Sequence, residues 1–144
     1  MTKIFGSERD ILNNTVTLIT SLTASRAVTD GLGVLSEIAG AITTDGTEQN
    51  VYINETPAGV FKPVCLKIDC TLHTATETII IRVYYRMMDG GGYVLHDESP
   101  PYVGVIYPPK ITVDLEPDRY GIKVTIEKTA GTNRSYDWEV FSKV

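Results

Sequence analysis

Residues 76–86 restrict what this chain can fold into more than any other stretch does. They read Thr-Glu-Thr-Ile-Ile-Ile-Arg-Val-Tyr-Tyr-Arg, without Gly or Pro, and branched and aromatic residues of this kind favour a β-strand. In an extended chain, one face of the stretch is wholly apolar and consists of Ile79, Ile81, Val83 and Tyr85. Such a strand needs neighbouring strands and a second layer over its apolar face. We therefore expect the rest of the chain to supply them.

The sequence after residue 46 has the pattern of short strands divided by turns. Clusters such as Asp89-Gly90-Gly91-Gly92 alternate with runs whose hydrophobicity has a period of two residues. No helical segments come between these runs, so a parallel α/β sheet is not expected. We predict an all-β fold, an antiparallel β-sandwich of jelly-roll type. Its strands are expected at residues 49–54, 64–72, 76–88, 93–96, 102–106, 110–115, 119–128 and 135–141.

A turn cluster at residues 43–47 divides the predicted chain into two parts, an N-terminal arm at residues 1–45 and the sandwich at residues 46–144. The core of the sandwich is formed by the inward-facing positions of its strands. It is expected to contain Ile79, Ile81, Val83, Ile122, Val124, Trp138 and Val140.

Within the arm, residues 29–42 favour a short amphipathic helix, because apolar residues recur there at helical spacing. Three glycines weaken this helix by roughly 1 kcal/mol each, so it needs packing on another surface. We expect its apolar stripe to contact other subunits, in a homo-oligomer that we predict to be a trimer. The stripe consists of Leu32, Leu35, Ile38 and Ile42.

Composition narrows the partners that the chain can have. The formal net charge is −5 and the basic residues are scattered, which argues against nucleic-acid binding. No apolar run approaches the ~20 residues of a membrane span, and the polar N-terminus lacks a signal-peptide core, so we expect synthesis in a cytoplasm and no membrane partner. Cys65 and Cys70 lie in one predicted strand, ~16 Å apart and on opposite faces, so we expect two free thiols.

Catalytic and metal-binding patterns are missing from the sequence. The two histidines, His73 and His96, do not have the spacing of metal ligands. The carboxylates of Asp114, Glu116 and Asp118 surround one turn but lack the spacing of an EF-hand. No nucleophile elbow or phosphate loop is present. We expect a protein that is not an enzyme and has no catalytic, cofactor or metal site.

Tyrosine is the one residue type that suggests a binding surface. Of the eight tyrosines, Tyr84, Tyr102 and Tyr107 fall on predicted outer faces or on loops bounded by proline. Exposed aromatic side chains suit sugar binding or subunit contacts. The alternative, in which these tyrosines are half-buried at the edges of the sandwich, remains open.

Several short runs resemble small β-sandwich modules of tailed-phage and related virion proteins. They lie at residues 45–49, 58–61, 81–84, 120–125, 129–135 and 138–141, and the most distinctive is Thr129-Ala130-Gly131-Thr132-Asn133-Arg134-Ser135. The resemblance implies a structural component of a virus particle and supplies no catalytic residues.

We expect a capsid decoration or cement protein, located in the virion, that stabilises the shell through contacts with the major capsid protein or other virion subunits. Its N-terminal region would bind the shell. The alternative is a receptor- or carbohydrate-binding module associated with a fibre or tail, which would use Tyr102 and Tyr107.

Overall fold

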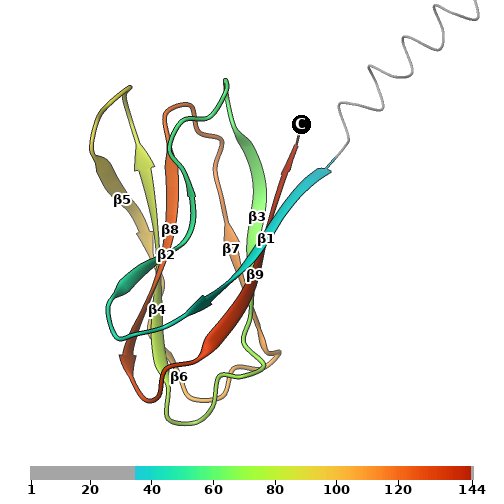
Figure 1. The fold of residues 1–144 in the computed structure, drawn as a ribbon, viewed down its shortest axis with the longest axis vertical. Helices are drawn as coiled ribbons and strands as arrows, with labels where there is room; N and C mark the ends of the chain where they lie inside the picture. Colours follow the sequence, from blue (N-terminus) through green and yellow to red (C-terminus); the bar gives the residue numbers. More distant parts are fainter. Residues whose placement is uncertain (1–34, 144) are drawn as a thin grey trace, which may run out of the picture. The chain divides into compact units, whose positions relative to one another are not determined.

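The computed structural model describes residues 35–143, which form one compact unit. This part of the chain is all β and contains no helix (Figure 1). Its nine strands are β1 (Leu35–Thr43), β2 (Glu48–Asn54), β3 (Lys62–Asp69), β4 (Thr78–Arg86), β5 (Tyr93–Glu98), β6 (Tyr102–Val103), β7 (Lys110–Asp114), β8 (Ile122–Ala130) and β9 (Ser135–Lys143).

The strands form two antiparallel sheets. Sheet A has the order β1-β9-β3-β7, and sheet B has the order β2-β8-β4-β5, with β6 also pairing with β4. Strands that are adjacent in sequence often lie in different sheets, and the two sheets are the two layers visible in Figure 1. Thus the all-β class and the antiparallel pairing predicted from the sequence are confirmed.

The core lies between the sheets and takes apolar side chains from both of them. Strand β4 alternates strictly between buried and half-buried residues, as its sequence predicts. Six of the seven predicted core residues are buried, at 0–4% exposure. The seventh, Trp138, is partly buried and packs against this core.

The helix predicted at residues 29–42 is wrong from Leu35 onward, because this part of the chain is strand β1. The strand pairs with β9 over its whole length. This ladder satisfies the backbone N–H and C=O groups, whereas a helix here would be weakened by its glycines. Leu35 therefore lies on the outer face of sheet A, whereas Ile38 and Ile42 lie on the inner face. Residues 29–34, including Leu32, lie outside the described residues.

The compact unit begins at Leu35, so it includes β1, which falls within the segment that we predict to be an arm. The turn at residues 43–47 leads from β1 in sheet A to β2 in sheet B.

Among the strands that end earlier than predicted, two do so for a clear local reason. The strand expected at residues 64–72 ends at Asp69, whose carboxylate accepts hydrogen bonds from the backbone and hydroxyl of Thr71 and turns the chain. The strand expected at residues 102–106 is reduced to β6, because Gly104 takes a φ of +69°.

Candidate functional site

Strand β1 presents an open edge of sheet A. Its nine residues pair with β9 without a register shift, from Leu35 opposite Lys143 to Thr43 opposite Ser135. No other strand in the part of the chain that the structure describes pairs with its second edge. Two of its apolar side chains are about half exposed, Leu35 at 53% and Ile38 at 49%. Backbone donors and acceptors on such an edge are available to another chain.

The other three edges carry features that discourage strand addition. Both β2 and β5 are interrupted by register shifts in their ladders, and bulges of this kind protect sheet edges. Strand β7 has only five residues and directly follows Pro108 and Pro109, which lack a backbone donor. Strand β1 has no bulge, proline or lysine, and its only charged residue is Glu37.

The middle of β1 has only small side chains, because it consists of Ala39, Gly40 and Ala41. Gly40 lies opposite Trp138 of β9, and a Cβ added to Gly40 would lie 2.6 Å from Cζ2 of the indole. The indole also meets the ring of Tyr52 edge-on, with centroids 6.0 Å apart. Trp138 is therefore held between β1 and sheet B, and glycine is required beside it.

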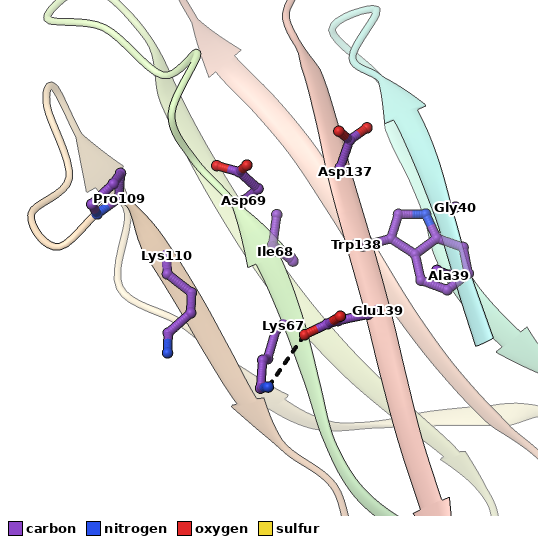
Figure 2. Close-up of a pocket in the computed structure, with 10 residues that line it drawn as sticks. All are labelled: Ala39, Gly40, Lys67, Ile68, Asp69, Pro109, Lys110, Asp137, Trp138 and Glu139. Carbon is purple, nitrogen blue, oxygen red and sulfur yellow. Dashed lines mark hydrogen bonds and ion pairs between the residues drawn. The ribbon is translucent and has the colours of Figure 1, made fainter. Parts of the chain in front are cut away.

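A groove of about 600 Å³ crosses sheet A from β1 to β7. Figure 2 shows the indole of Trp138 beside Gly40 at one end and Lys110 at the other. Between them, Lys67 and Glu139 form an ion pair at 3.2 Å. The complete lining is Ala39, Gly40, Lys67, Ile68, Asp69, Pro109, Lys110, Asp137, Trp138 and Glu139. The groove thus offers a small apolar floor near β1 and mixed charges toward β7.

An ion pair with a buried carboxylate joins the loop before β4 to the loop before β9. Glu77 is fully buried and pairs with Nε of Arg134 at 3.1 Å. Its carboxylate also accepts bonds from the hydroxyl of Thr74 at 2.5 Å, the amide of Thr74 at 2.6 Å and the hydroxyl of Thr76 at 3.0 Å. These bonds, those from Thr74 foremost, lower the pKa of Glu77 to about 2.

A second buried polar contact lies near this ion pair. Nδ1 of His73 lies 2.8 Å from the hydroxyl of Tyr136, and burial lowers the pKa of the imidazole. Burial also raises the pKa of the Cys70 thiol to about 11, so this cysteine is a poor nucleophile. Gly131 takes a φ of +84° and packs against the backbone of Thr76 and Glu77.

The run that most resembles virion modules, residues 129–135, therefore has a structural role in this fold. Its Gly131 and Arg134 hold the loop before β4. In the described residues, no group of three or more His, Cys, Asp or Glu side chains could hold a metal ion.

The three tyrosines singled out from the sequence have different surroundings. Tyr107 is 94% exposed. Tyr102 is partly buried and packs against the core. The hydroxyl of Tyr84 donates to Glu48 at 2.6 Å, and Nζ of Lys123 lies 4.4 Å from the ring centroid. Only Tyr107 is thus free to contact a partner with its whole side chain.

Sequence reasoning missed a charge network on the outer face of sheet B. Arg82 of β4 forms ion pairs with Glu98 at 2.5 Å, Glu127 at 2.6 Å and Glu48 at 3.3 Å. These carboxylates, Glu127 foremost, raise the pKa of the guanidinium. The only signal was an arginine inside an apolar strand, because its partners come from β2, β5 and β8 and meet only in the sheet.

Comparisons with known proteins do not assign the chain to a family. No protein-family model matches it, and no curated protein does. A solved structure of Bacillus endospore appendages, which "form a novel family of disulfide-linked pili", is similar at 18% identity with a TM-score of 0.35, covering 77% of this chain and 88% of that chain. Residues 35–143 include no helix long and apolar enough to cross a membrane.

Proposed function

We propose that the protein is a capsid decoration protein, a virion component that binds a preformed shell and stabilises it. We also assign its two sheets to the jelly-roll class, since consecutive strands of the chain often alternate between the four-strand orders β1-β9-β3-β7 and β2-β8-β4-β5, to which sheet B adds the short β6. Jelly rolls recur in viral capsid proteins and in lectins. A fold alone does not give a function, so the proposal rests on a surface.

The observation that carries the proposal is the groove on sheet A. It lies on the same sheet as β1, and β1 directly follows the N-terminal region that we expect to bind the shell. A shell segment in this groove would meet apolar floor at Ala39 and Gly40 and charges of both signs beyond it. Such a surface combines an apolar part with charged side chains, and protein interfaces are likewise mixed in polarity.

Binding only to the assembled shell would stabilise the shell by mass action. A ligand present at a hundredfold excess over its Kd contributes about 2.7 kcal/mol per site. Many copies on one lattice would add their contributions.

The test compares shells lacking the protein with shells to which purified protein has been added. We expect the full chain to raise the temperature at which the shell opens, and removal of residues 1–27 to abolish binding while the strands remain folded. Lys110→Glu reverses a charge in the groove and should weaken binding. Lys62→Glu makes the same change on the same sheet outside the groove and should not. Equal binding by both lysine variants, with unchanged shell stability, would remove the support for this function.

The exposure of Tyr107 favours a second candidate, a fibre- or tail-associated module that binds a receptor or carbohydrate. A tyrosine that is 94% exposed can stack on a sugar ring at little cost in side-chain entropy. This function predicts specific hits on a glycan array that disappear in Tyr107→Ala. Tyr102→Ala is not a clean test, because Tyr102 packs against the core.

A further inference from the structure

Within residues 35–143, the edge of β1 that faces away from β9 pairs with no other strand. We propose that two molecules join their β1 strands antiparallel about a two-fold axis at Ala39, so that two copies of sheet A become one continuous sheet. This inference concerns self-association and does not depend on shell binding.

The two faces of β1 allow only some registers. Pairing with β9 places Leu35, Glu37, Ala39, Ala41 and Thr43 on the outer face and Ser36, Ile38, Gly40 and Ile42 on the inner face. Residues directly opposite each other in an antiparallel ladder point to the same face. A two-fold axis through a residue of β1 therefore joins outer face to outer face, whereas an axis between residues would join unlike faces. An axis at Ala39, the middle of the strand, pairs all nine residues.

Side-chain sizes favour this central register. Ile38 of one copy would lie opposite Gly40 of the other, which has no side chain of its own. Gly40 is the position covered by the indole of Trp138, so the half-exposed Ile38 would pack beside an aromatic ring. The apolar side chain that is most exposed on the inner face of β1 would thus become covered.

Charges also agree with the pairing. The only charged residue of β1, Glu37, would lie opposite Ala41 of the other copy, so two carboxylates would not face each other. The protein has a net charge of −5, so two copies repel each other over long distances. A β1 strand with a single charge adds little to this repulsion when two copies pair. The grooves of the two molecules, which both end at Ala39, would meet at the axis.

Cysteine crosslinking of the full-length chain tests the register. In a Cys65→Ser background, we expect Ala39→Cys to give a disulfide-linked dimer under mild oxidation, because directly opposite Cα atoms lie about 4.5–5.5 Å apart. Ala41→Cys is the matched control on the same strand and face. Its two copies would be about 13 Å apart along the ladder, which is too far for a bond.

Charge insertion at the edge tests the association itself. Ile38→Lys should weaken self-association, measured by sedimentation equilibrium, by about tenfold or more. The control is Val94→Lys on β5, also a half-exposed residue on an edge strand, and it should leave association unchanged. Circular dichroism of each variant establishes that it is folded.

Three results would overturn the inference. One is a wild-type chain that stays monomeric at high concentration. Another is crosslinking of Ala41→Cys as efficient as that of Ala39→Cys, or no crosslinking of either. The third is an oligomer, including the trimer predicted from the sequence, that persists unchanged in Ile38→Lys. A protein that dimerises as proposed but does not bind a shell would contradict only the proposed function, so the two proposals are tested separately.

Discussion

Single buried side chains decide how well the two sheets pack. Ile81, at the middle of β4, is 3% exposed and belongs to the core shared by both sheets. Its replacement by alanine should lower the free energy of unfolding by about 2–5 kcal/mol, because the neighbours cannot fully close the cavity. Urea denaturation measures the change. Val105→Ala, at a side chain that is 71% exposed, should change it by no more than about 0.5 kcal/mol.

Apolar core residues could be predicted from the sequence, whereas buried polar partners could not. The alternation of β4 and β8 is local, and it correctly places Ile79, Val83 and Val124 in the core. The ion pair of Glu77 and Arg134 joins positions 57 residues apart, and a glutamate in a β-prone stretch has no local sign that it will be buried.

Among the elements, β1 shows why a hydrophobic spacing can mislead. Leu35, Ile38 and Ile42 fit one face of a helix, whereas in the strand Leu35 lies on the outer face and Ile38 and Ile42 lie on the inner face. The deciding contact is with β9, about 100 residues later in the chain, and a local pattern cannot contain it. The open edge of β1 is therefore not predictable from the sequence, although the sequence does predict that Leu35 and Ile38 contact other subunits.

Strand β1 also makes a prediction about Gly40. Gly40→Ala should displace the indole of Trp138, because the added Cβ would lie 2.6 Å from Cζ2, and overpacking of this kind costs typically about 1–3 kcal/mol. Trp138 is the only tryptophan in the chain, so its fluorescence spectrum reports the displacement directly. Gly92→Ala, where an added Cβ meets nothing within 4 Å, should leave the spectrum unchanged. An unshifted spectrum in Gly40→Ala would mean that the indole is not held against β1.

For the whole molecule, we predict a loss of stability in acid. Folding lowers the pKa of His73 below 6.5, through burial, and the pKa of Glu77 from 4.5 to about 2, through hydrogen bonds led by Thr74. The unfolded chain therefore binds more protons than the folded chain as the pH falls below about 6.5, and the free energy of unfolding decreases with it. The decrease continues as the pH falls from about 4.5 toward 2, where the Glu77 carboxylate takes up its proton.

Urea midpoints measured across this acid range provide the check. Glu77→Gln should be less stable at neutral pH and should lose less stability below about pH 4.5 than the wild type does. Glu116→Gln, at a side chain that is 70% exposed, should follow the wild-type curve. A Glu77→Gln curve parallel to that of the wild type would show that this carboxylate does not control the acid response.

The pairing of Leu35 with Lys143 has a mechanical consequence. These two residues lie at the same end of the ladder between β1 and β9, so tension applied between them separates the strands from that end. The load then falls on one residue pair at a time, in order, until it reaches Thr43 and Ser135. A ladder opened in this way resists far less force than one whose strands are made to slide past each other, where many hydrogen bonds share the load. When force is applied between these two positions, β1 should separate from β9 first, one residue pair after another.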